Sequence, residues 1–142
     1  MRLTLIALVL CVPVAVADDK DELKKLEGTW DVTDLKAAGK DVPYKGKLDR
    51  LTIKDGTMTG FGPEVKLSTD GTQKPKWLNM TFSRDGMERT VNAIYELTGD
   101  EVKIAMPMAP GKDSGKAFEN KRPEGFDTTG KIVMVITAKK AK

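Results

Sequence analysis

Apolar and polar residues alternate along most of this chain. In the stretch KWLNMTF, Leu78, Met80 and Phe82 share one face of an extended strand, and the residues between them share the other face. The same period of two recurs in TVNAIYEL and in EVKIAM, as is typical of strands with one buried face. The pattern predicts eight strands near residues 28–36, 47–54, 57–61, 64–69, 75–83, 88–97, 101–107 and 131–138.

Turn residues separate these strands at short intervals. Asp55-Gly56, Asp70-Gly71, Asp85-Gly86 and Gly99-Asp100 each stand between alternating segments, and such pairs favour tight hairpins. Eight strands in sequential hairpins have unpaired edges unless the sheet closes. We therefore expect an all-β fold, a single antiparallel up-and-down barrel of about eight strands. The segment DKDELKKLEG predicts a short helical turn before the first strand.

The end of the chain departs from simple alternation. The last run, KIVMVIT, is apolar on both faces, so we expect a strand that is covered on each side. The residues before it, from Met108 to Gly130, are rich in Gly, Pro, Lys and Asp. They predict an irregular crossing that leads into the final strand.

The first residues have the pattern of an export signal. One basic residue precedes an apolar run from Leu5 to Val16, and Ala15-Val16-Ala17 provides a cleavage site. We expect a signal peptide over residues 1–17, a mature domain over 18–142, and a periplasmic, envelope or extracellular location. The run is too short to span a membrane, so no transmembrane segment is expected after signal removal. A lipid anchor on Cys11 is the alternative, but Leu10 before it is large.

Composition narrows the range of functions. The chain has 24 Lys and Arg against 21 Asp and Glu, and the two signs are interspersed, so we expect no nucleic-acid partner. It has no histidine, and its single cysteine lies in the expected signal peptide. Ser-His-Asp and Cys-His catalysis and the usual zinc sites are thereby excluded. We expect no enzymatic activity, no catalytic residue and no cofactor or metal.

Three patterns suggest more specific chemistry but favour simpler interpretations. APGKDSGKAF has too few residues between its glycines for a phosphate-binding loop, and Ala117 stands where such a loop needs Ser or Thr. The four turn aspartates recur every fifteen residues, yet separate turns do not bring calcium ligands together. Met106 and Met108 are compatible with Cu(I), although methionines on one strand face more often fill a core.

The opening of the expected barrel resembles a known family. Gly28-Thr29-Trp30 is similar to the Gly-x-Trp motif of lipocalin and calycin barrels. The resemblance implies that Trp30 plugs the closed end and that Lys139 or Lys140, with Lys139 preferred, lies over its ring. LEGTWDV, AAGKDVP, RLTIKDG, KPKWLNMTF, AIYELTGDEVKIAM and KIVMVITAKK also resemble, in that order, a family of small exported lipocalin-like domains abundant in planctomycete bacteria. This family implies a fold and an envelope location, but no chemistry.

Two functions of different classes follow from a barrel without catalytic groups. The leading hypothesis is binding of a small apolar or amphipathic ligand inside the barrel. The expected lining residues are Leu78, Met80, Tyr95, Ile104 and Met106. The alternative is a protein-interaction or envelope-associated barrel, whose interior is filled by its own side chains and which acts through its outer surface.

Overall fold

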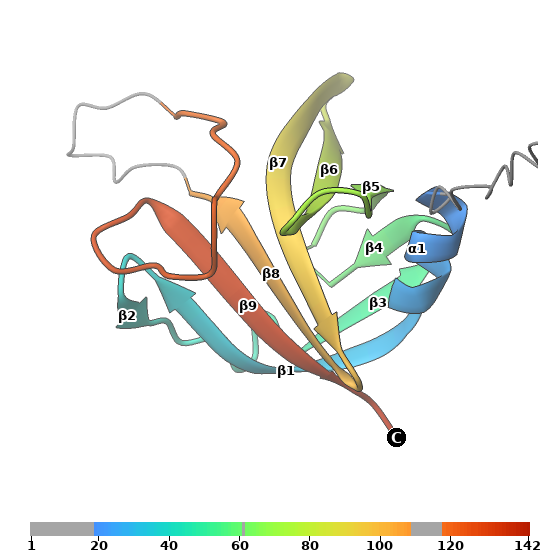
Figure 1. Ribbon diagram of the computed structural model, residues 1–142, viewed down its shortest axis with the longest axis horizontal. Helices are drawn as coiled ribbons and strands as arrows, with labels where there is room; N and C mark the ends of the chain where they lie inside the picture. Colours follow the sequence, from blue (N-terminus) through green and yellow to red (C-terminus); the bar gives the residue numbers. More distant parts are fainter. Residues whose placement is uncertain (1–18, 61, 109–117) are drawn as a thin grey trace, which may run out of the picture.

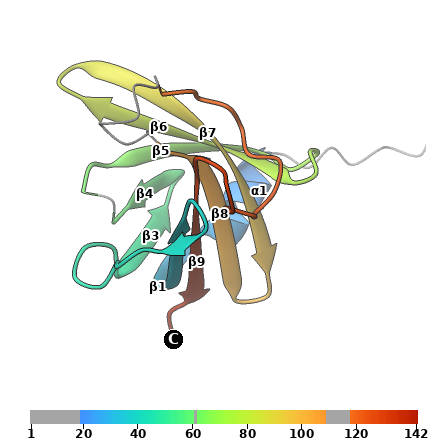
Figure 2. The same ribbon diagram turned by 90° about the vertical axis from the view of Figure 1, so that its left-hand side faces the viewer.

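The described residues form an antiparallel β-barrel with one short helix (Figure 1). The structure is a computed structural model that describes residues 19–60, 62–108 and 118–142. The expected signal peptide, residues 1–17, and the glycines of APGKDSGKAF therefore lie outside the described residues. Figure 2 shows the strands wrapping around a common axis.

Within the described residues, one helix precedes nine strands in chain order. The elements are α1 (Asp19–Leu26), β1 (Gly28–Ala37), β2 (Lys40–Asp41), β3 (Arg50–Lys54), β4 (Thr57–Thr59), β5 (Val65–Asp70), β6 (Lys76–Arg84), β7 (Met87–Thr98), β8 (Glu101–Pro107) and β9 (Val133–Lys140). Strands β1 and β3 to β9 pair in sequence order, and β9 pairs with β1. The prediction of a closed antiparallel barrel of eight strands is confirmed.

The hairpins follow from the turn residues. Lys54 pairs with Thr57, and Arg84 pairs with Met87, so Asp55-Gly56 and Asp85-Gly86 are two-residue loops. Both aspartates have a positive φ, 51° at Asp55 and 53° at Asp85. A two-residue loop of this kind matches the right-handed twist of the strands that it joins, and Asp-Gly adopts it readily.

Some strand boundaries differ from those predicted. Residues 47–49 do not begin a strand, because the Asp49 carboxylate accepts hydrogen bonds from the Gly46 amide and closes a turn there. Strand β2 was not predicted. It is only two residues long and pairs with β1 outside the closed barrel. The last strand starts and ends two residues later than expected.

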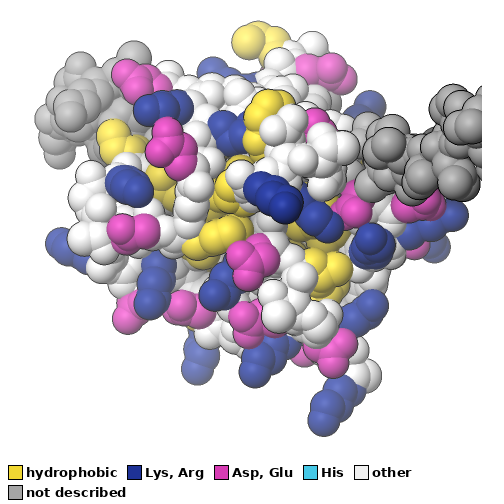
Figure 3. Space-filling view, in the orientation of Figure 1, with side chains coloured by type: hydrophobic (Ala, Val, Ile, Leu, Met, Phe, Trp, Pro, Cys, Tyr) yellow, Lys and Arg dark blue, Asp and Glu magenta, His cyan; other side chains and the backbone are white. Residues whose placement is uncertain are grey.

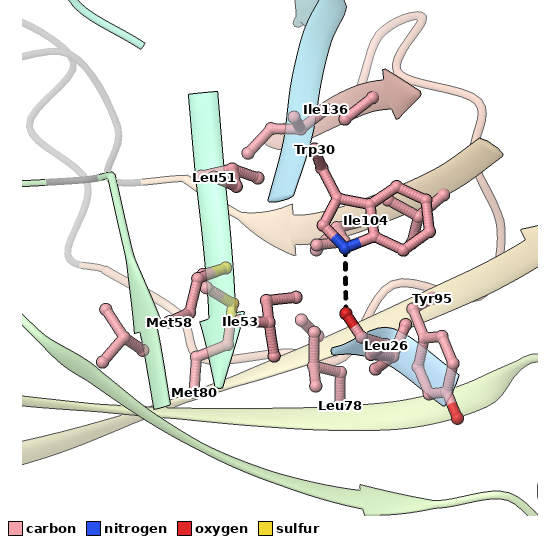
Figure 4. Packing of buried hydrophobic residues seen from close by; sticks show 14 of the residues in the cluster. Leu26, Trp30, Leu51, Ile53, Met58, Leu78, Met80, Tyr95, Ile104 and Ile136 are labelled. Atoms are coloured by element: carbon pink, nitrogen blue, oxygen red, sulfur yellow. Dashed lines mark hydrogen bonds between the residues drawn. The ribbon is translucent and has the colours of Figure 1, made fainter. Parts of the chain in front are cut away.

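The core contains inward-facing side chains from every strand of the barrel wall. Helix α1 covers one end, where Leu26 and Trp30 are each 1% exposed. The Trp30 indole Nε1 donates a hydrogen bond to the Leu26 carbonyl oxygen at 2.9 Å (Figure 4). A second, smaller apolar cluster lies on the outer face of the wall, where Phe126 and Val133 pack against Ile94, Ala105 and Val135. β9 is thus covered on both faces, as its sequence predicts.

Substitution of Trp30 tests the contribution of the buried indole to stability. We expect Trp30→Ala to lower the free energy of unfolding by about 3–5 kcal/mol, because it removes a large ring from a packed core. Urea unfolding monitored by circular dichroism measures the loss. Trp77→Ala is the matched control, since Trp77 is 37% exposed and should cost clearly less. Equal losses in the two variants would contradict a special role for Trp30.

Candidate functional site

The residues predicted to line an interior ligand site do point into the barrel. Leu78, Met80, Tyr95, Ile104 and Met106 have exposed fractions between 0 and 5%, and all belong to one continuous cluster. Figure 4 shows several of these side chains packed below Trp30, together with residues of β3, β4 and β9. The inner faces of the wall thus contact one another.

Trp30 is held at the covered end of the barrel by neighbours on both sides. In the β1–β9 ladder Trp30 pairs with Lys140, and directly paired residues project on the same face of a sheet. The Lys140 Nζ lies 5.6 Å from the centroid of the Trp30 ring. Lys139 pairs with Asp31, so it projects on the opposite face. The preferred choice of Lys139 was therefore wrong, and Lys140 provides the cation.

Gly28 makes room for this arrangement. Its φ is +134°, a conformation that side-chain-bearing residues rarely adopt, and an added Cβ would lie 3.1 Å from the Lys140 Cε. The predicted trio of glycine, tryptophan and lysine is therefore brought together, with the lysine shifted by one position.

A buried carboxylate ties helix α1 to the barrel wall. The Glu22 side chain is 5% exposed, and Lys76 donates to its Oε2 at 3.0 Å. The Tyr95 hydroxyl also donates to Oε2, at 2.8 Å, and Lys25 donates to Oε1 at 3.2 Å. Burial raises the pKa of Glu22, but the hydrogen bonds from Tyr95, Lys76 and Lys25 outweigh it, so the pKa lies below its ordinary value.

The Asp70-Gly71 turn is adapted to this carboxylate. An added Cβ at Gly71 would lie 2.8 Å from the Glu22 Cδ, so a larger residue there would displace the Glu22 carboxylate. The Asp70 carboxylate accepts hydrogen bonds from the Thr72 amide and hydroxyl within the same turn. Asp70 thus caps its own turn. Among the described residues, no group of three or more carboxylates, histidines or cysteines is placed to hold a metal ion.

The barrel wall parts between β7 and β8. The two strands pair only from Ile94 to Thr98 on β7, which leaves the first half of β7 without a strand partner on that side. The Asn120 side chain replaces the missing strand. Its Oδ1 accepts from the Asn92 amide at 2.9 Å, and its Nδ2 donates to the Thr90 carbonyl oxygen at 2.8 Å. One side-chain amide therefore satisfies a donor and an acceptor of the open edge.

Arg122 fixes the same segment to the outer face of the wall. Its Nη1 donates to the Ala93 carbonyl oxygen, and its Nη2 donates to the Asn79 Oδ1 at 2.7 Å. The guanidinium carbon lies 4.3 Å from the centroid of the Trp77 ring, close enough for a favourable cation–π contact. Burial lowers the pKa of Arg122, and the charge of Asp70 partly opposes that effect.

A cleft of about 620 Å³ opens between this segment and the start of β9. Pro107, Pro123, Ile132 and Val133 provide its apolar surface. Its other described lining residues are Glu119, Lys121, Arg122, Glu124, Gly125 and Lys131. In Figure 3, apolar side chains are visible near the middle of one molecular face, surrounded by charged side chains of both signs. A second cavity, of about 220 Å³, lies beside the turn before β6.

Comparison with known proteins adds no functional information. No family model, no curated protein and no solved structure matches this chain. Within the described residues, no helix is long and apolar enough to cross a membrane.

The residues of the cleft were not predicted from the sequence. The segment from Met108 to Gly130 was expected only as an irregular crossing to the last strand, and none of its residues was assigned to a site. One signal was present, because Asn79 and Asn92 stand at outward positions of neighbouring strands, where asparagine is uncommon. In the folded protein, the Asn79 side chain accepts a hydrogen bond from Arg122, and the Asn92 side chain donates one to the Asn120 carbonyl oxygen.

The buried Glu22 carboxylate should make stability depend on pH. Because its pKa is lower in the folded chain, its contribution is present above about pH 4.3, the ordinary pKa of glutamate, and is lost as the pH falls through the lowered value. We expect Glu22→Gln to lower the free energy of unfolding at pH 7 by about 1–3 kcal/mol and to weaken the loss on acidification. Urea unfolding at several pH values measures both effects.

Two comparisons make this test specific. Glu64→Gln, at an exposed position, should leave the free energy of unfolding at pH 7 unchanged. The pKa values of Asp70 and Asp127 are also lowered, by hydrogen bonds from Thr72 and Thr129, and we expect both groups to titrate alike in variant and parent because the substitution removes none of these bonds. An acid loss of the same size in Glu22→Gln and in the parent would contradict the assignment to Glu22.

Proposed function

We propose that this protein is an exported, non-enzymatic barrel that binds a small amphipathic molecule in the cleft on its outer wall. The cleft volume of about 620 Å³ supports this proposal, because small-molecule sites generally measure about 300–1,000 Å³. Such sites combine an apolar surface with a few polar groups, and the lining of the cleft has both.

The packing of the barrel favours the outer cleft over the interior. An interior ligand would need space among the inward-facing side chains, yet Leu51, Met58, Met80 and Ile136 are fully buried in one cluster. Opening a ligand-sized space there would remove contacts that stabilise the core. Binding at the outer wall requires no such rearrangement.

The length of the crossing segment also supports a role beyond connection. Pro107 and Val133 pair directly in the β8–β9 ladder, so a tight turn would be enough to join the two strands. Instead residues 108–132 intervene, and those of them that the structure describes form no helix or strand. Long irregular connections of this kind in compact domains are commonly functional.

A cleft-filling substitution tests the proposed function. Gly125 lines the cleft, and an added Cβ there meets no atom within 4 Å. Its φ lies outside the left-handed region, so Gly125→Trp should fill the cleft without backbone strain. We expect the parent to bind the fluorescent amphiphile 1-anilinonaphthalene-8-sulfonate at about one site per chain, and Gly125→Trp to bind it at least about tenfold more weakly.

The matched control adds the same ring elsewhere. Thr52→Trp, at an exposed position of β3, should bind the probe like the parent. Unfolding curves establish that each variant is folded. If folded Gly125→Trp binds as well as the parent, or if the parent binds no probe, the small-ligand function is wrong. A protein-interaction barrel that acts through its outer surface then becomes the better hypothesis.

The proposed export has its own test. We expect protein recovered from the envelope or the medium of an expressing bacterium to begin at Asp18, after the Ala15-Val16-Ala17 site. Intact mass spectrometry measures this directly. A retained N-terminus, or a lipid adduct on Cys11, would contradict signal-peptide cleavage at this position.

A further inference from the structure

We propose that the outer cleft selects an amphipathic monoanion, whose charged group is bound by Arg122 while its apolar body lies on Ile132 and Val133. This inference rests on the proposed function and adds the chemical class of the ligand. It follows from the surroundings of one cation, from the other charges of the cleft and from its apolar surface.

Arg122 is held in position before any ligand binds. Two hydrogen bonds fix its guanidinium, one to the Ala93 carbonyl oxygen and one to Asn79. The Trp77 ring, 4.3 Å away, supports one face of the group. A guanidinium fixed on three sides loses little conformational entropy when it forms a further bond, so an anion can bind to it at low cost.

The charge of Arg122 has no close counter-ion among the described residues. Five ion pairs within 4 Å occur there, and none includes Arg122. Both of its hydrogen-bond acceptors are neutral. The charge of Asp70 acts on Arg122 only from beyond ion-pair distance, so this partly buried cation has lost hydration without gaining an opposite charge in contact with it. An anion placed beside it would restore that interaction.

Arg122 also retains donors that can reach a ligand. A guanidinium has five N–H groups, and the bonds to Ala93 and Asn79 use two of them. The Arg122 side chain is only partly buried and borders the cleft, so its other N–H groups are not sealed in the protein. Since Arg122 lines the cleft, a carboxylate or sulfonate there can accept from them.

The remaining charges of the cleft limit the ligand to a single negative charge. Lys121 and Lys131 line the cleft with Arg122 and add to its positive potential. Glu119 and Glu124 also line it and would repel a second negative charge. This balance favours a monoanion over a polyphosphate or a nucleic acid.

The apolar part of the ligand has a matching surface. Ile132 is 45% exposed and lines the cleft beside Val133 and Pro107. Covering such a surface with an apolar group stabilises a complex by removing it from water. A molecule with one anionic head and a compact apolar body therefore fits both halves of the cleft.

Two related probes separate the anionic group from the apolar body. N-phenyl-1-naphthylamine has the same ring system as 1-anilinonaphthalene-8-sulfonate but lacks the sulfonate. We expect the parent to bind the sulfonate about tenfold more tightly, because a charge-assisted hydrogen bond adds to the apolar contact. Arg122→Gln should remove that preference, so that the ratio of the two affinities falls to about one. Fluorescence titration measures both affinities.

Arg84→Gln is the matched control, because the Arg84 side chain is 91% exposed and stands at the end of β6, next to the Asp85-Gly86 turn. It should preserve the preference for the sulfonate. If Arg122→Gln fails to fold, the salt dependence of binding to the parent tests the inference instead. Added salt should weaken the binding of the sulfonate probe and leave the binding of the neutral probe unchanged. Equal affinities in the parent, or a preference that survives in folded Arg122→Gln, would overturn the inference.

The two proposals fail in different ways. If Gly125→Trp blocks both probes but the parent does not distinguish them, the cleft binds ligands without selecting anions, and only the further inference is wrong. If neither probe binds, the proposed function is wrong. Decanoate should displace the sulfonate probe from the parent. A membrane surface is the other source of such an anion. If the protein co-sediments with vesicles containing phosphatidylglycerol in a way that depends on Arg122, and decanoate does not displace the probe, the proposal of a small free ligand is wrong.

Discussion

The pairing of β1 with β9 is the contact on which the rest of the structure depends. It joins the first and last strands of the barrel, and without it the sheet would have two open edges. The same ladder places Lys140 opposite Trp30, so the closure of the barrel also assembles the covered end. One long-range pairing therefore determines both the shape of the wall and the position of its largest buried side chain.

The closure of the barrel does not explain the long segment between β8 and β9. Because Pro107 and Val133 already pair, residues 108–132 are not required to bring β8 and β9 together. The described part of this segment instead covers the outer apolar cluster and satisfies the open edge of β7 through Asn120. It also brings Arg122 to the wall, where it borders the cleft. The barrel thus has an inner core that stabilises it and an outer layer that borders the cleft.

Two charged groups in this layered structure are balanced differently. Glu22, on the helix that covers one end of the barrel, accepts hydrogen bonds from two lysines and a tyrosine, so its charge is compensated within the protein. Arg122 bonds only to a carbonyl oxygen and a side-chain amide, which are neutral. The first arrangement attaches a helix to the wall, whereas the second leaves a cation beside a cleft. This difference is the physical basis for assigning stability to Glu22 and ligand recognition to Arg122.

The eight strands of the barrel wall, their hairpins and the inward positions follow from the sequence alone, apart from strand boundaries and the short β2, because period-two alternation and Asp-Gly turns depend on neighbouring residues. Leu78, Met80 and Tyr95 were correctly assigned to the interior for this reason. Only the tertiary structure decided that Lys140 and not Lys139 meets Trp30, since this depends on the register between strands far apart in the chain. The cleft also depended on tertiary structure. Arg122 bonds to residues 29 and 43 positions away, and no local pattern encodes such contacts.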